Sequence, residues 1–322
     1  MKALVTGGTG FIGSHLVEEL IRQGFSVTCL IRDKSDLKWI ESYPINYIKV
    51  KDVGAGIGSL EDSLGDFDYV FHLAGLTKAG SAEEFFSTNV RGTGSILESL
   101  DKYNGNLRRF VHVSSLAAGG PCKGTTAVDT DTEPDPVSDY GYSKLEGERL
   151  VRQYMDRFPV TIIRPPAVYG PRDKDFYVVF KMIKKGFFPH MGKSYYSMIY
   201  VEDLVKGIIK SAKSDKTIGK TYYLTDREIH TNVSIAEAIA QELRCRYVKI
   251  GIPKRVIPLV VSIYTRIFKN GIINPDKLKE LKYTHWLCND DEAAKDFGFQ
   301  PKVKLKDGVK WTANWYRIHK WL

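Results

Sequence analysis

The chain has 322 residues, of which 43% are hydrophobic, 26% charged and 12% aromatic. This length predicts two domains or one large domain with an extension, and the apolar fraction excludes wholesale disorder. No apolar run is long enough for a membrane span, and glycine follows the first residues too early for a secretory signal. The four cysteines are too far apart for a zinc site. We therefore expect a cytoplasmic protein with reduced thiols and no metal.

The formal net charge of +9 comes from the last quarter of the chain. Residues 1–240 hold 30 basic and 30 acidic side chains, whereas residues 241–322 hold 17 and 8. This distribution disfavours a nucleic-acid-binding protein, and no platform of interleaved aromatic and basic residues accompanies it. The basic excess instead favours an anionic ligand or an anionic surface beside the C-terminal quarter.

Short apolar runs alternate with helical patterns through the first half of the chain. Strand–helix alternation of this kind produces βαβ units, so we expect an α/β fold with a doubly wound parallel sheet. The predicted strands are 2–6, 26–31, 45–50, 69–73, 109–114 and 160–164, and the predicted helices are 14–23, 81–102 and 140–157.

Glycines recur between the first strand and the first helix, in the run TGGTGFIG over residues 6–13. Gly7 allows a tight turn, Gly10 lets the backbone approach a pyrophosphate, and Gly13 allows close packing of helix on strand. The helix N-terminus, with Phe11 and Ile12, offers free N–H groups and a partial positive charge to phosphates. Because this run lies between a strand and a helix, it predicts a dinucleotide-binding site rather than an ordinary turn.

The end of the second strand usually distinguishes NAD from NADP, because an acidic residue there binds a ribose hydroxyl and an arginine accepts a 2′-phosphate. Here the strand ends in LIRDK over residues 30–34. Arg32, with help from Lys34, suits a 2′-phosphate. We therefore predict NADP as the preferred cofactor and NAD as the alternative, in which case Arg32 is solvated and stacks on the adenine.

Tyr140 and Lys144 open a predicted helix four residues apart and so share one of its faces. A tyrosine is a poor base at neutral pH, but a neighbouring ammonium and an oxidised nicotinamide would favour its phenolate form. The pair thus predicts a general acid/base. Ser115, at the end of the fifth strand, is expected to bind the reacting oxygen, and Ser114 is the weaker candidate.

Beyond residue 164 the regular alternation ends. Three prolines interrupt it, a loop-rich stretch follows to residue 200, and a helix at 202–212 and a strand at 221–225 return to the sheet. The remainder is mostly helical. We therefore expect a nucleotide-binding part at 1–165, with returns to the sheet at about 200–225, and a smaller, mostly helical substrate-binding part formed by 166–199 and 226–322.

Six motifs in order resemble the extended short-chain dehydrogenase/reductase family, the NAD-dependent epimerase/dehydratase group. They are TGGTGFIG (6–13), FHLAG (71–75), TNVRGT (88–93), VSS (113–115), YGYSK (140–144) and RPPAVYGPRD (164–173). The resemblance covers nearly the whole chain. It implies a Rossmann fold with a C-terminal substrate domain, a Ser115–Tyr140–Lys144 triad, and a homodimer formed through the helices near 81–102 and 140–157.

The same resemblance assigns further residues to the cofactor site. It implies that Asp52 and its neighbour Val53 lie at the adenine, that Asn89 steadies the site, and that His72 is structural. It also implies that the segment from Arg164 to Val168 passes the nicotinamide. The remaining cofactor-lining residues that it implies are Leu73, Ala74, Gly75, Pro165 and Val168.

Three departures from the family's patterns favour a reductase or dehydrogenase similar to dihydroflavonol reductase or 3β-hydroxysteroid dehydrogenase. Ser115 is followed by LAA, without the acidic pair of the 4,6-dehydratases. Ala167 replaces an asparagine that contacts sugar phosphates in many sugar-nucleotide enzymes, and the stretch 194–198 lacks their diphosphate-binding arginine. The alternatives are a sugar-nucleotide epimerase with tightly bound NAD and a non-catalytic NAD(P)-binding sensor.

The basic segment 244–270 contains an apolar stretch flanked by cations. We expect a lid helix over the substrate pocket, in preference to a helix that contacts an anionic membrane surface. A third interpretation is that Lys254 or Arg255 replaces the missing diphosphate-binding arginine. The substrate is thus expected to be a small molecule, either anionic or lipid-like, whose identity loop composition does not specify.

Overall fold

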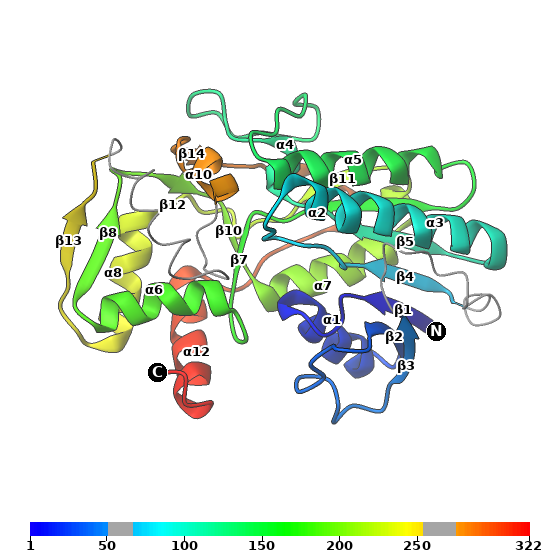
Figure 1. Ribbon diagram of the computed structural model, residues 1–322, viewed down its shortest axis with the longest axis horizontal. Helices are drawn as coiled ribbons and strands as arrows, with labels where there is room; N and C mark the ends of the chain where they lie inside the picture. Colours follow the sequence, from blue (N-terminus) through cyan, green and yellow to red (C-terminus); the bar gives the residue numbers. More distant parts are fainter. Residues whose placement is uncertain (51–66, 254–274) are drawn as a thin grey trace.

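The computed structural model describes residues 1–50, 67–253 and 275–322 (Figure 1). Asp52 and Val53, which were expected near the adenine, lie outside these residues. So do residues 254–270 of the basic segment, so the lid helix stays a prediction. Among the described residues, no helix combines the length and the apolar character needed to cross a membrane.

Seven parallel strands form the central sheet, in the order β11-β6-β5-β4-β1-β2-β3. The strands are β1 (Lys2–Thr6), β2 (Ser26–Arg32), β3 (Asn46–Val50), β4 (Tyr69–His72), β5 (Arg109–Val113), β6 (Val160–Arg164) and β11 (Thr221–Tyr223). The doubly wound parallel sheet is therefore confirmed. The strand order reverses between β1 and β4, where Thr6 lies beside His72, and open α/β sheets bind ligands at such a switch point.

Helices cover both faces of this sheet (Figure 1), and a hydrophobic core lies on each face. Successive residues of β1 alternate between them, because Ala3 and Val5 face one core and Leu4 the other. One core packs against α1 (Phe11–Arg22) and α7 (Val201–Ala212), and the other against α3 (Gly92–Tyr103) and α5 (Asp139–Gln153). This burial on both faces explains why the strands are apolar throughout.

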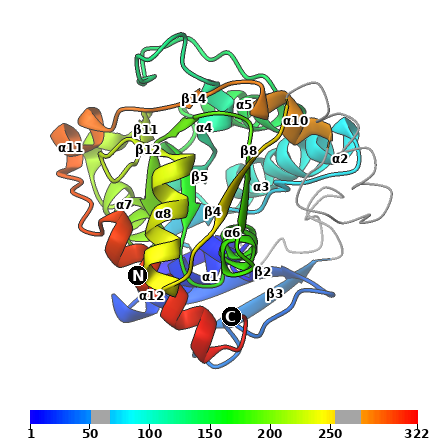
Figure 2. The same ribbon diagram turned by 90° about the vertical axis from the view of Figure 1, so that its left-hand side faces the viewer.

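A second part of the molecule has its own core beside the sheet, in which α6, α8 and α12 lie side by side (Figure 2). Its largest buried side chains include Tyr169, Phe180 and Tyr316. Its elements are β7 (Ala167–Tyr169), α6 (Lys174–Lys184), β8 (Phe187–His190), β9 (Tyr195–Tyr196), β10 (Met198–Tyr200), β12 (His230–Thr231), α8 (Asn232–Leu243), β13 (Val248–Gly251), α10 (Pro275–Leu281), β14 (His285–Trp286) and α12 (Leu305–Ile318). Helix α11 (Asp291–Phe297) instead packs in the core of α1 and α7, through Ala293 and Phe297.

The structure differs from the predicted elements in two regions. The single helix predicted over 81–102 consists of α2 (Ala82–Phe86), a π-helical turn η3 (Ser87–Arg91) and α3. The stretch 165–200, expected to be loop-rich, contains α6 and four short strands. Asp173 begins α6 by accepting the backbone N–H of Asp175 at 2.8 Å, a capping signal that the preceding prolines obscure in the sequence.

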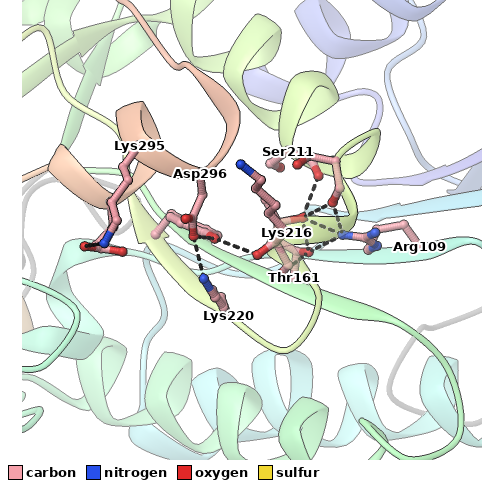
Figure 3. Close-up of polar contacts among 11 residues, drawn as sticks. Arg109, Thr161, Ser211, Lys216, Lys220, Lys295 and Asp296 are labelled. Atoms are coloured by element: carbon pink, nitrogen blue, oxygen red, sulfur yellow. Dashed lines mark hydrogen bonds and ion pairs between the residues drawn. The ribbon is translucent and has the colours of Figure 1, made fainter.

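A buried arginine connects the sheet to the segment that leads into β11 (Figure 3). The Arg109 side chain is 1% exposed, and its guanidinium donates to Thr161 Oγ1 at 3.1 Å and to the Ser214 carbonyl at 3.0 Å. Nearby, Asp296 of α11 accepts bonds from Lys220 and Tyr222, both at 2.6 Å. These bonds fix β11 at the edge of the sheet, so Arg109 has a structural role.

Candidate active site

The glycine turn joins β1 to α1 at the switch point of the sheet. Gly7 has a φ of 72°, and a Cβ there would lie 2.8 Å from backbone atoms of Leu73 and Ala74. A Cβ on Gly13 would lie 2.1 Å from the Gly7 carbonyl oxygen. The turn therefore requires glycine at both positions, because any side chain would push β1, α1 and the end of β4 apart.

A cavity of about 610 Å³ runs from this turn to the beginning of α5. The predicted site residues that line it are Gly7, Gly10, Phe11, Ile12, Gly13, Leu73, Gly75, Tyr140, Lys144 and Val168, and the weaker serine candidate, Ser114, lines it too. Thus one continuous cavity brings together the glycine turn and the tyrosine–lysine pair. The predicted residues that do not line it, among those the structure describes, are Arg32, Lys34, Ala74, Asn89, Ser115 and Pro165.

Helix α5 holds Tyr140 and Lys144 one turn apart at one end of the cavity. The Lys144 ammonium donates to the Val113 carbonyl at 2.8 Å, and burial lowers the pKa of Lys144 to about 8. The Glu148 carboxylate, one turn further along α5, opposes this shift.

We expected a lowered pKa for Tyr140, but its pKa is raised. Burial raises it to about 12, a hydrogen bond from Ser115 acts to lower it, and the Glu280 carboxylate acts to raise it further. The phenolate is therefore not favoured in the cofactor-free protein, because desolvation disfavours the charged form more than the neighbouring groups stabilise it.

The two serines at the end of β5 have different partners. Ser114 donates to Glu148 Oε1 at 2.5 Å, and Glu148 forms a buried, bidentate salt bridge with Arg164 at 2.7 and 2.9 Å. Ser115 accepts the backbone N–H of Ala117 at 3.1 Å and is hydrogen-bonded to Tyr140. Of the two hydroxyls, that of Ser115 is thus the one beside the tyrosine.

Asn89 and His72 form a polar layer behind the cavity. The Asn89 amide exchanges two bonds with the backbone of Leu76, at 2.7 and 3.0 Å, and donates to Ser143 at 2.9 Å. His72 lies between Thr6 and Thr93, and burial lowers its pKa to about 3. A neutral, fully bonded His72 is a structural residue, and Asn89 holds the loop after β4 against α5.

Several residues that line the cavity were not singled out in the sequence. The charged and aromatic ones among them are Asp36, Lys38, Trp39, Lys78, Arg172, Asp173, Lys174 and Asp175. The Lys78 ammonium pairs with Asp175 of α6, and burial raises the pKa of Asp173 to about 7. Arg172 and Asp173 belong to the motif at 164–173, so the sequence contained a signal for them. The turn between β7 and α6 brings them to the cavity, and the sequence does not predict that turn.

The NAD dependent epimerase/dehydratase family matches this chain over residues 3–224. The chain belongs to this family. The family, which the motifs indicated, consists of NAD-dependent enzymes. Curated members of similar length include the uncharacterized protein YbjS of Escherichia coli, 25% identical over 99% of this chain and 98% of its own length. The ceramide reductase of Caulobacter vibrioides is 29% identical over 99% of this chain and 95% of its own length.

Solved structures of epimerase/dehydratase enzymes share this fold. The UDP-glucose 4-epimerase of Thermotoga maritima superposes with a TM-score of 0.82 at 20% identity, over 99% of this chain and 100% of its own. The UDP-glucuronic acid 4-epimerase of Bacillus cereus superposes with a TM-score of 0.78 at 23% identity, over 99% of each chain. These similarities show that this chain has the Rossmann-type fold of those enzymes.

Proposed function

We propose that the chain is an NAD(P)-dependent oxidoreductase that reduces a ketone, or oxidises the corresponding secondary alcohol, with a Ser115–Tyr140–Lys144 triad. The observation that carries this proposal is the single cavity that joins the glycine turn to Tyr140 and Lys144. The fit of a dinucleotide is supported by the tight turn at Gly7, which has no room for a side chain, and by the first turn of α1, which lines the cavity.

The dinucleotide, when bound, supplies or accepts the hydride at C4 of its nicotinamide. Tyr140 gives its hydroxyl proton to the oxygen of the ketone as that oxygen gains negative charge, or takes the proton back in the oxidation. Ser115 holds the same oxygen through its hydroxyl. Lys144, one turn along α5 from Tyr140 and fixed by the Val113 carbonyl, supplies the positive charge that stabilises the phenolate left after proton transfer.

The pKa of Tyr140 in the cofactor-free protein suits the role of proton donor that reduction requires. A tyrosine with a pKa of about 12 is protonated at neutral pH and is ready to donate its proton. The absence of an acid after Ser115 disfavours dehydration, and the stretch 194–198 without a cation disfavours binding of a nucleotide diphosphate. Two relatives named as reductases, the ceramide reductase and a farnesyl-dihydroquinoline-oxide ketoreductase of Stigmatella aurantiaca, add support.

A sugar-nucleotide epimerase that retains NAD is the second candidate. It is favoured by two relatives named as epimerases, one from Bacillus subtilis at 29% identity and one from Escherichia coli at 28% identity over 78% of this chain. Such an enzyme shows no net redox change. A non-catalytic NAD(P)-binding sensor is a third candidate. The tyrosine–lysine pair in the cavity disfavours it, because a sensor does not need an acid/base pair.

The remaining proposals concern the surroundings of the site. NADP is proposed as the preferred cofactor because of Arg32 and Lys34, although the Bacillus cereus neighbour carries NAD. Residues 166–199 and 226–322 are proposed to contact a substrate that is anionic or lipid-like. The cytoplasmic location and the homodimer also stay predictions.

Replacement of Tyr140 by phenylalanine tests the proposed chemistry. We expect the variant to bind NADPH and NADH as the unmodified protein does and to lose oxidation of the reduced cofactor with a ketone substrate, since it lacks only the proton donor. Near-normal turnover by the variant would refute the triad. Purified protein that contains non-exchangeable NAD and interconverts sugar nucleotides without consuming NAD(P)H would favour the epimerase instead.

A further inference from the structure

The turn between β7 and α6 places an arginine in a backbone conformation that arginine rarely adopts. The Asp173 N–H donates to the Gly170 carbonyl at 3.3 Å, so residues 170–173 form a β-turn with Pro171 and Arg172 at its centre. Arg172 has a φ of 71°. Turns with proline first and a positive φ second favour glycine or asparagine there, because a Cβ strains this conformation. Strain of this kind concentrates at functional sites.

Helix α1 holds this turn in place (Figure 1). His15 Nε2 donates to the Pro171 carbonyl at 2.9 Å, and burial lowers the pKa of His15 to about 4, so that its ring is neutral. One turn along the helix, Glu18 accepts a bond from Arg172 at 2.8 Å. The turn is thus attached to the same helix whose first turn carries the glycine motif.

The guanidinium of Arg172 retains binding capacity that the protein does not use. Its side chain is only 12% exposed, and the guanidinium carbon lies 5.5 Å from the centre of the Trp39 ring. Its Nε and one terminal nitrogen are buried and have no hydrogen-bond partner. Buried donors without partners are costly, and the side chain must shift before these two nitrogens can reach a ligand.

The cavity shows where such a ligand would lie. Arg172 and Trp39 line it together with Gly10, Phe11 and Ile12 of the glycine turn. The Arg172 guanidinium has a permanent positive charge and planar N–H donors, which suit a phosphate. Arg32 and Lys34, by contrast, do not line the cavity.

We propose that Arg172 is a phosphate-binding residue of the dinucleotide site, and that it binds the cofactor's diphosphate or its 2′-phosphate opposite the N-terminus of α1. The inference rests on the proposed function, because it takes a dinucleotide as the occupant of the cavity. It explains the unusual backbone, because the positive φ of Arg172 places its guanidinium at the wall of the cavity beside Trp39.

The test measures binding and stability of the cofactor-free protein rather than activity. Arg172→Gly removes the guanidinium and also the strain, so the melting temperature should not fall, whereas the Kd for the cofactor, measured by titration calorimetry with NAD⁺ and NADP⁺, should rise roughly tenfold or more. Arg172→Lys, which keeps the charge without the planar fork, should show a smaller rise and serves if the glycine variant fails to fold.

Arg244 supplies a matched control. It also has a positive φ, of 51°, at the C-terminus of α8, and it does not line the cavity. Arg244→Gly removes an arginine from the same kind of backbone and should leave both Kd values unchanged.

The pattern of the two Kd values identifies the phosphate. A rise for both dinucleotides places Arg172 on the diphosphate, and a rise for NADP⁺ alone places it on the 2′-phosphate. Unchanged binding of both by the Arg172 variants overturns the inference and leaves the proposed function intact. If the unmodified protein binds neither dinucleotide, the proposed function fails together with the inference.

Discussion

The carboxylate of Asp276 accepts the backbone N–H of Tyr140 at 3.0 Å. It also accepts that of Asp139 at 2.7 Å, while Ser138 donates to Glu280 of the same helix α10 at 2.8 Å. Two acidic residues from the C-terminal part thus cap the helix that carries the proposed acid/base, where negative charge is favourable. The position and the protonation of Tyr140 therefore depend on α10.

Glu280→Gln should shift the pH dependence of the reaction. The Glu280 carboxylate raises the pKa of Tyr140, so its removal should lower that pKa. Because reduction needs the protonated tyrosine, the loss of kcat/KM at high pH should begin at a lower pH in the variant. Glu292→Gln on α11 is the control, and an unmoved alkaline limb in Glu280→Gln would contradict the coupling.

Lys144→Met should stabilise the cofactor-free protein at neutral pH. The pKa of Lys144 is about 8 in the folded state and 10.5 when the side chain is exposed, so the unfolded chain binds more protons between these limits and the unfolding free energy rises with pH there. Below pH 8 the full cost of burying the ammonium applies, on the order of 3 kcal/mol. The difference between variant and unmodified protein in urea unfolding should shrink from pH 7 towards pH 10; a constant difference would contradict the shifted pKa.

Glu148→Gln should destabilise the protein strongly. It leaves the Arg164 guanidinium, 3% exposed, without its counter-charge, and removal of one partner of a buried pair costs about 3–5 kcal/mol. Urea unfolding of Glu146→Gln provides the comparison. Glu146 lies on the same helix in a solvent-exposed pair with Arg149, and its loss should cost less than about 1 kcal/mol. Equal losses in the two variants would show that the buried network contributes no more than the surface pair.

NADPH should bind more tightly than NADH if Arg32 and Lys34 approach a 2′-phosphate. Arg32→Ala should then raise the Kd for NADPH by roughly tenfold, the value of a charge-assisted bond, and leave that for NADH unchanged. Fluorescence titration of the reduced cofactors checks both values. Tighter binding of NADH by the unmodified protein would exclude the preference.

Local patterns in the sequence are sufficient for the parts of the fold that depend on neighbouring residues. The predicted strands 2–6 and 160–164 agree with β1 and β6 at both ends, because buried parallel strands are continuous β-branched and apolar runs. The glycine turn and the tyrosine–lysine spacing are equally local.

The remaining site residues depend on contacts between distant segments. Asp276 follows Tyr140 by 136 residues, and nothing in either segment indicates that they meet. The place of Arg172 in the cavity depends on a positive φ, which arginine does not favour and which a sequence pattern therefore does not predict. The pKa of Tyr140 depends on desolvation, which only the packed structure determines.

Strand β11 limits where this chain can be divided into separate fragments. It is added to β6 at the edge of the sheet, and α7, just before it in the chain, shares the core of α1. A fragment that ends at residue 165 would leave β6 as an open edge strand and would expose the apolar surface that α7 covers. The native sheet and its core therefore include residues 201–223, which the chain supplies only after the first segment of the second part.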